Sequence, residues 1–415
     1  LERNARGLRS RDGARVVTRS AIIALLAIAC SSSPSQDDGG ADAATDADAG
    51  ISNVAPLVVD NGPTGQSLNV LFTTITICVP GTATCQTIDH VEVDTGSTGL
   101  RLVSSVLDGS LALPAETASN GDAISECYAY ADGFNWGPVV TADVQIGGEI
   151  ASAVPIQIAG GKSGTIPSLC SSAGSEEDTV ASLGGNGILG IGFQTADCGN
   201  ACSNTSGPRT GAYYTCAGAT CTVAAIPNSN QVQNPVSLFP QDNNGVAVQL
   251  PDIDPAGAPT ATGLLIFGIG TAPNNDLGSA QVININSLDG YFTTTYGSQT
   301  LTSSFIDSGS VCYGFPDTTI PQCTGDETGF YCPTSTLDLT ATNTGTNKVS
   351  VVTPFKVANA TTLWNSKNAA FDNLAITAFA PGYFDWGLSF FFGRTVFTAI
   401  SGASTPAGPG PYFAY

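Results

Sequence analysis

Basic residues are scarce in this chain, and histidine is almost absent. The sequence holds 13 Lys and Arg against 34 Asp and Glu, which gives a formal net charge of −21. A body this acidic repels phosphate backbones, so we expect no nucleic-acid partner. The one histidine, His90, provides too few imidazoles for a His-rich site. We therefore expect neither a metal nor an organic cofactor.

Wholesale disorder is also excluded. Apolar residues make up 42% of the 415 residues and the mean hydropathy is +0.14, so there is enough apolar surface to form a core. Only 11% of the residues are charged, against about 25% in a typical globular protein. The length allows one large domain or two ordinary ones.

The first 29 residues are typical of an export signal. Arginines are concentrated in the first 20 residues, and the apolar run Ala21–Ala29 follows them. This run is too short to span a bilayer but suits a signal peptide. It ends in Ala27-Ile28-Ala29-Cys30, which resembles the lipobox of bacterial lipoproteins, although Ala27 replaces the usual Leu. We expect a signal peptide over 1–29 and a lipid anchor on Cys30 that attaches the protein to a membrane, with a plain signal peptide as the alternative.

Residues 30–51 are expected to form a disordered acidic linker after the lipidated Cys30. They are small and acidic and offer almost nothing to bury. Signal and linker together predict an exported protein, either a lipoprotein of the outer membrane or cell surface, or a secreted protein.

Export makes disulfide bonds the expected state of the eleven cysteines after Cys30. Short separations suggest Cys78–Cys85, Cys198–Cys202, Cys216–Cys221 and Cys323–Cys332, with Cys127–Cys170 left over and Cys312 unpaired. Spacing alone does not fix this connectivity.

From residue 51 onward the sequence predicts an all-β protein. Clusters of Gly, Pro, Asn and Asp separate apolar and β-branched runs. These runs cover 68–79, 88–93, 100–103, 139–146, 154–158, 246–250, 263–268, 281–285 and 348–357. The stretch Thr361–Phe379 is the best candidate for a short helix. A β-rich chain of this length must close its sheet edges through barrels or stacked sheets.

A weak internal repeat divides this β-rich part. Val91–Val103 reads VEVDTGSTGLRLV and Ser304–Phe315 reads SFIDSGSVCYGF, so each is an apolar strand that runs into Asp-[Thr/Ser]-Gly-Ser. Each copy is followed some tens of residues later by an apolar segment with glycine, Gly187–Phe193 and Trp386–Gly393. A lone Asp-Thr-Gly is usually only a turn, but one copy in each half favours a paired site.

Two carboxyls held face to face can activate water for hydrolysis. Because both cannot ionise cheaply at short range, they share one proton. One carboxylate then accepts a proton from water while the other carboxyl donates to the substrate carbonyl. The Gly after each Asp lets two backbones approach closely.

These motifs resemble the pepsin-type aspartic proteases. More closely, the chain resembles a family of secreted bacterial proteins of unknown function with pepsin-like motifs. The resemblance covers residues 52–415 and implies an all-β, two-lobed pepsin-like (acid protease) double β-barrel with a central cleft. It implies an N-terminal lobe over 52–240 and a C-terminal lobe over 241–415.

The resemblance also implies roles for individual residues. Asp94 and Asp307 would be the catalytic pair, and Tyr130 and Gly133 would belong to a flap over the cleft. The dyad would be supported by the residues that follow each Asp in the two motifs, which are Thr95, Gly96, Ser97, Ser308, Gly309 and Ser310.

Two positions depart from the pepsin pattern. Pepsins carry a Trp where this chain has Arg101, so a cation is expected in or near the cleft, and it would lower the pKa values of the dyad if it approached them. Trp136 is a candidate to replace the missing ring beside Tyr130. Asp385 stands where an apolar residue is expected before Trp386-Gly387.

The sequence therefore predicts an exported aspartic endopeptidase that acts on polypeptides as a monomer. The alternative is a catalytically inactive surface lipoprotein of the same fold that binds peptides or glycans in its cleft.

Overall fold

Strands dominate the computed structural model, which describes residues 52–415 except 131–132, 205–210 and 379. The predicted signal peptide, Cys30 and the acidic linker lie outside the described residues, so they stay predictions. Residues 52–415 fall within one compact unit.

The larger sheet of the described residues has sixteen strands. Its spatial order is β11 (Thr220–Val223), β10 (Tyr213–Ala217), β5 (Ala123–Ala129), β6 (Gly133–Ile146), β7 (Glu149–Ala159), β4 (Thr98–Val103), β9 (Gly187–Ile191), β3 (Cys85–Asp94), β2 (Leu71–Cys78), β1 (Val54–Val59), β13 (Ala261–Phe267), β12 (Gly245–Leu250), β22 (Arg394–Ala399), β25 (Tyr412–Ala414) and β14 (Val282–Asn284), with β8 (Ser175–Glu176) paired to β6.

A second sheet of seven strands lies in the C-terminal half. Its order is β19 (Ser350–Val357), β18 (Leu337–Thr344), β15 (Phe292–Tyr296), β16 (Gln299–Ile306), β21 (Asp385–Trp386), β17 (Tyr313–Phe315) and β20 (Ala375–Thr377). A two-stranded ribbon joins β23 (Ser404–Thr405) to β24 (Gly408–Pro409).

Helices are short throughout the described residues. The α-helices are α1 (Ser168–Ser171), α2 (Val180–Leu183) and α3 (Ala360–Ser366). Single 3-10 turns occupy Ser104–Val106, Gly199–Ala201, Asn228–Asn230, Pro235–Leu238, Gly325–Glu327 and Leu388–Phe390.

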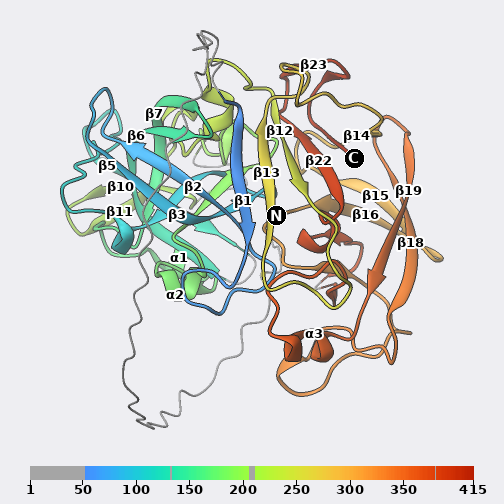
Figure 1. Ribbon diagram of the computed structural model, residues 1–415. Helices are drawn as coiled ribbons and strands as arrows, with labels where there is room; N and C mark the ends of the chain where they lie inside the picture. The colour runs from blue at the N-terminus through green and yellow to red at the C-terminus, as the bar shows by residue number, and fades with distance from the viewer. Residues whose placement is uncertain (1–51, 131–132, 205–210, 379) are drawn as a thin grey trace, which may run out of the picture. The chain divides into compact units, whose positions relative to one another are not determined.

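The two predicted lobes are joined through β1 and β13. These strands pair antiparallel over their whole length, from Val54 opposite Ile266 to Val59 opposite Ala261. In Figure 1 the blue β1 runs beside the yellow β13, with β5, β6 and β7 on one side and β15, β16 and β18 on the other. One sheet thus continues from the first lobe into the second.

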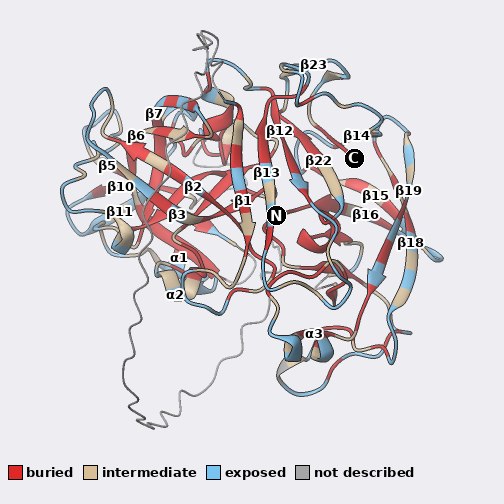
Figure 2. Ribbon diagram, in the orientation of Figure 1, coloured by how far each residue is buried: buried red, intermediate tan, exposed pale blue. Residues whose placement is uncertain are grey.

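The core lies where strands are covered on both faces (Figure 2). Along the strand β3, burial increases from the first residue to the last. In its first six residues, exposed positions alternate with half-buried or buried ones, whereas Val91–Asp94 are all buried. Such a run is typical of a strand that passes from the sheet surface into the core, and it carries Asp94 inside.

The first copy of the internal repeat is built from β3, β4 and β9. The strand β9 runs parallel to β3, with Asp94 opposite Gly190, and antiparallel to β4, with Gly99 also opposite Gly190. A Cβ on Gly190 would lie 2.6 Å from the backbone nitrogen of Thr98. Glycine is therefore required for the apolar segment to fit between the two strands.

The second copy repeats this arrangement with β16, β17 and β21. The strand β21 runs parallel to β16, with Ile306 opposite Trp386, and antiparallel to β17, with Tyr313 opposite Trp386. A Cβ on Gly387 would overlap the Cys312 carbonyl oxygen. The duplicated topology confirms the predicted all-β, two-lobed pepsin-like fold.

The predicted short helix is present at the start of the stretch 361–379. It is α3, capped by the Asn359 side chain, which accepts from the Thr362 N–H, and ended by Lys367 at φ 61°. The chain then returns to the sheet, where β20 pairs in parallel with β17. Pairing with a buried strand overrides the weak helix preference of this stretch.

The predicted disulfide pairs are all present. The bonds are Cys78–Cys85, Cys127–Cys170, Cys198–Cys202, Cys216–Cys221 and Cys323–Cys332. Cys312 is a buried free thiol. Five bonds in one chain are consistent with export. Within the described part of the chain, no helix is long and apolar enough to cross a membrane.

Candidate active site

The two Asp-[Thr/Ser]-Gly-Ser loops meet where the lobes join. The Ser308 N–H donates to Thr95 Oγ1 at 2.9 Å, and the Thr95 N–H donates to Ser308 Oγ at 3.1 Å. Ser308 Oγ in turn donates to the Val93 carbonyl at 2.7 Å. These reciprocal bonds fix the distance and orientation of one loop relative to the other.

The two carboxyls lie inside this frame, each against the glycine of the opposite loop. Asp94 is 5% exposed and Asp307 is 2% exposed. A Cβ on Gly96 would come within 2.5 Å of Asp307 Cγ, and a Cβ on Gly309 within 2.6 Å of Asp94 Cγ. Asp94 also lies close enough to Asp307 for its charge to raise the pKa of Asp307. The structure thus places each carboxyl of the predicted pair against the opposite loop.

Local donors orient the Asp94 carboxyl. Its Oδ1 accepts from the N–H groups of Gly96 at 2.8 Å and Ser97 at 3.1 Å. Its Oδ2 accepts from Ser97 Oγ at 2.6 Å. A turn that presents two N–H groups and a hydroxyl holds a carboxylate with its oxygens fixed in direction.

The Asp307 carboxyl is held in an equivalent way. Its Oδ1 accepts from the Gly309 N–H at 2.8 Å, and its Oδ2 accepts from Ser310 Oγ at 3.0 Å. All six support residues named from the two motifs therefore lie where the resemblance implies. Their part in catalysis stays a prediction.

The electrostatics of Asp307 favour a bound proton. Burial, the neighbouring charge of Asp94 and the further charge of Asp385 raise the pKa of Asp307 well above its ordinary value. A close pair of carboxyls with one raised pKa is the arrangement that shares a single proton.

A small cavity lies beside the pair, between the lobes. Its volume is about 40 Å³, and its lining includes Thr95 and Gly96 from one loop and Tyr291, Phe305 and Ile306 from the other lobe. A cavity of this size is large enough to hold a water molecule.

The predicted flap residues lie on the hairpin of β5 and β6. Tyr130 follows β5 and Gly133 begins β6, while the tip at 131–132 lies outside the described residues. The Tyr130 hydroxyl donates to Asn135 Oδ1 at 2.7 Å. That these residues cover a cleft stays a prediction.

Trp136 does not replace the missing ring beside Tyr130. Its indole contacts Tyr214 edge to face, with centroids 5.3 Å apart, and its N–H donates to the Gly164 carbonyl. The ring beside Tyr130 is instead Tyr128, at 5.0 Å. The guanidinium of Arg101 lies over the Tyr128 ring, 3.5 Å from its centroid.

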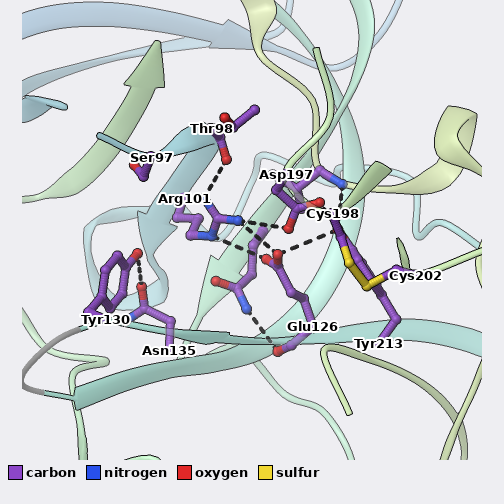
Figure 3. A network of polar contacts seen from close by, with 12 residues as sticks. Ser97, Thr98, Arg101, Glu126, Tyr130, Asn135, Asp197, Cys198, Cys202 and Tyr213 are labelled. Atoms are coloured by element: carbon purple, nitrogen blue, oxygen red, sulfur yellow. Dashed lines mark hydrogen bonds and ion pairs between the residues drawn. A yellow bond between two sulfur atoms is a disulfide. The ribbon is translucent and has the colours of Figure 1, made fainter. Parts of the chain in front are cut away.

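Arg101 is not a cation at the dyad. The charges that act on Asp307 are carboxylates, and the Arg101 side chain is fully buried inside the first lobe. Figure 3 shows its contacts: it donates to Glu126 Oε1 at 2.8 Å and Oε2 at 3.2 Å, and to Asp197 Oδ2 at 3.0 Å. Arg101 therefore does not lower the pKa of Asp307, which is raised instead.

The network around Arg101 extends to two further groups. Arg101 Nη1 donates to the Thr98 carbonyl at 2.8 Å, directly after the Asp94 loop, and Tyr213 Oη donates to Asp197 Oδ1 at 2.7 Å. Burial and the neighbouring Glu126 carboxyl raise the pKa of Asp197 well above its ordinary value, against the lowering effect of Arg101. The network thus ties the root of the β5–β6 hairpin to the loop that carries Asp94.

Sequence reasoning missed the partners of Arg101. A signal was present, because Arg101 and Glu126 are the single charges of two otherwise apolar strands, TGLRLV and AISECYA. Such isolated charges are stable inside a sheet only when they are paired. The pairing with Asp197, 96 residues away, could not be read from spacing.

Three comparisons relate the chain to known proteins. A family described as "Protein of unknown function (DUF3443)" matches residues 49–415. None of the curated proteins compared with the chain matches it. Among solved structures, the crystal structure of the aspartic proteinase from Irpex lacteus is similar at 17% identity and a TM-score of 0.48, over 87% of this chain and 96% of that chain.

Proposed function

The chain belongs to a family of unknown function (DUF3443), and we propose from its own geometry that it is an exported aspartic endopeptidase. The observation that carries the proposal is that Asp94 and Asp307, two buried carboxyls from separate lobes, each lie against the glycine of the opposite loop. Reciprocal hydrogen bonds between Thr95 and Ser308 hold the two loops together. Burying two carboxyls next to each other lowers the stability of the fold. Proteins retain such destabilising groups mainly at functional sites. Hydrolysis by an activated water is the chemistry that such a pair serves.

The two carboxyls take different roles in the proposed reaction. Asp307, whose pKa is raised, carries the shared proton and donates it to the carbonyl oxygen of the substrate. Asp94, held by three donors, accepts a proton from the attacking water. That water adds to the carbonyl carbon. The C–N bond then breaks as the leaving nitrogen takes the proton from Asp94 and one hydroxyl of the intermediate returns its proton to Asp307, which leaves a carboxylic acid and the single-proton dyad.

The raised pKa of Asp307 also sets the pH range in which the proposed enzyme is active. The single-proton form of the dyad is lost as the pH rises through the raised value. Activity should therefore be highest under acidic to mildly acidic conditions and fall toward alkaline pH.

The test is cleavage of an unfolded protein substrate by the full-length protein across roughly pH 2–8. Asp94→Asn and Asp307→Asn should each abolish cleavage, whereas Asp276→Asn, which neutralises an exposed carboxylate, should not change it. Cleavage that survives Asp94→Asn would refute the proposal. Binding of a statine-type transition-state mimic without any turnover would instead favour the inactive peptide-binding protein.

We also propose that the enzyme acts outside the cytoplasm, anchored by lipid on Cys30. The five disulfide bonds support the oxidising compartment. The Cys30→Ser variant should no longer incorporate radiolabelled palmitate, and it should no longer be recovered in the membrane fraction. Unchanged fractionation of that variant would mean that no anchor is attached at Cys30.

A further inference from the structure

Residues 67–70, directly before β2, extend from the first lobe into the second. Leu68 packs against a buried cluster of the second lobe that includes Cys312 and Phe371. The strand β2 itself belongs to the first lobe, where it pairs with β3 and β6. These four residues, the interlobe latch, therefore join a strand of one lobe to the core of the other.

Asn69 makes the polar contacts of the interlobe latch. It is 1% exposed. Its side chain donates to the carbonyls of Phe371 at 2.7 Å and Val311 at 2.9 Å, and it accepts from the Phe371 N–H at 2.6 Å. Its Nδ2 is also 3.1 Å from Ser389 Oγ, and its own N–H donates to the Ala369 carbonyl at 2.7 Å. Every one of these partners belongs to the second lobe.

The backbone of Asn69 is in the left-handed region, with φ at 49°. Residues other than glycine rarely adopt this conformation, although asparagine does so more often than most. It persists only where the surrounding contacts hold it, and it is found mainly at functional sites. The contacts of Asn69 are therefore strong enough to keep a first-lobe residue in an unfavourable conformation.

The interlobe latch is connected to both carboxyls of the proposed dyad. On the side of the second lobe, Val311 directly follows the motif at 307–310, so the bond from Asn69 holds the end of that loop. On the side of the first lobe, β2 begins at Leu71 and pairs with β3, which ends at Asp94. One buried amide thus links the strands that carry one carboxyl to the loop that carries the other.

We propose that Asn69 is a positioning residue that holds the two lobes at the separation in which Asp94 and Asp307 share a proton. The reciprocal bonds between Thr95 and Ser308 orient the two loops, and the interlobe latch fixes the lobes that carry them. Reacting groups must be held within roughly 0.5 Å of their productive geometry. The effect on catalysis rests on the proposed endopeptidase function, whereas the latch does not.

The decisive variant is Asn69→Gly, because glycine keeps the left-handed backbone and removes only the side-chain bonds. We expect kcat to fall about tenfold or more and KM to change less than about threefold, since the dyad is displaced but substrate contacts remain. The charge of Asp94 raises the pKa of Asp307. A wider separation lowers that pKa, so the alkaline limb of kcat/KM should move to lower pH.

Ser67→Ala is the matched control. The Ser67 hydroxyl is also buried, but it donates to the Gly184 carbonyl at 2.9 Å, within the first lobe. Its loss should lower the free energy of unfolding and leave kcat and the alkaline limb as in the wild type. Wild-type kcat and an unshifted limb in Asn69→Gly would overturn the proposal. The same changes in both variants would also overturn it, because they would show a general effect of destabilisation.

Amide hydrogen exchange tests the interlobe latch without any need for activity. In Asn69→Gly, exchange should become about tenfold faster or more in peptides that cover 307–312 and 369–372, and stay unchanged in peptides from β6 and β7. Leu68→Ala, at a half-buried position, weakens the same latch with less risk to folding and should give a smaller change in the same peptides.

The exchange result separates the interlobe latch from the enzyme. Unchanged exchange at 307–312 in both variants would refute the latch, even in an active protease. Faster exchange there, in variants of a protein whose wild type cleaves no substrate, would support the latch and refute the endopeptidase.

Discussion

Replacing Arg101 with Leu tests the buried network that supports the Asp94 loop. The guanidinium donates to both oxygens of Glu126 and to Asp197. These three side chains are at most 2% exposed, so solvent screening is small. Leu supplies no donor, and the variant leaves an unpaired carboxylate inside the first lobe.

Arg101→Leu should lower the free energy of unfolding by a large amount. Removing one partner of a buried ion pair destabilises a protein by about 3–5 kcal/mol. The Thr98 carbonyl also loses the bond from Arg101, but such losses within one network do not add. We expect a loss of about 3–5 kcal/mol at neutral pH, which is a large part of the roughly 5–15 kcal/mol that stabilises most folds.

This loss should depend on pH. Without the guanidinium, the lowering effect of Arg101 on the pKa of Asp197 is lost, so burial raises that pKa further above its value in the unfolded chain. Such groups stabilise the fold below their unfolded-state pKa, and this contribution disappears as the pH rises through the folded-state values. The destabilisation of Arg101→Leu should therefore be smallest near about pH 4 and largest near about pH 7.5.

The assay is urea unfolding followed by tryptophan fluorescence at both pH values, because urea does not screen charges. Arg101→Lys is the matched control: it keeps the charge but loses the two-pronged contact with Glu126, so it should cost about 1–3 kcal/mol with little pH dependence. A cost below about 1 kcal/mol for Arg101→Leu, or one that is equal at both pH values, would refute the reasoning.

Three further predictions follow from the contacts of the described residues. Gly96→Ala should abolish cleavage in a folded protein, because the added Cβ would come within 2.5 Å of Asp307 Cγ; wild-type activity with unchanged circular dichroism would contradict the tight contact. Tyr130→Phe removes a hydrogen bond within the hairpin. It should lower kcat/KM several-fold and change the free energy of unfolding by about 1 kcal/mol or less. A variant that loses stability but keeps its kcat/KM would show that Tyr130 does not act as a flap residue. Replacing both Cys127 and Cys170, which are 43 residues apart, with Ala should lower the free energy of unfolding by about 4 kcal/mol. The same replacement of Cys78 and Cys85, which are seven residues apart, should lower it by about 2 kcal/mol. The reverse order would show that loop entropy is not the main source of the stabilisation.

Local sequence was sufficient for the all-β class, the repeat and the carboxyl pair. Asp94 and Asp307 each sit in a four-residue motif after an apolar strand, and the motif itself supplies the N–H groups and hydroxyls that bind the carboxyl. Disulfide pairs of short separation were predictable for the same reason, since neighbouring cysteines on a hairpin have few other partners. The short helix expected in 361–379 forms as α3, whose end the sequence did not give. Its length is limited because a strand from another part of the chain pairs with Ala375–Thr377.

The sequence by itself determined which residues could form a proton-sharing pair, because that information is carried by contiguous residues. Only the tertiary structure decided that Arg101 turns away from the pair toward Glu126 and Asp197. It also decided that Asp385 is buried between β16 and β17. The physical reason is that a buried charge is governed by whichever groups the fold brings within a few ångströms of it. Those groups lie tens of residues away along the chain, where no local pattern records them.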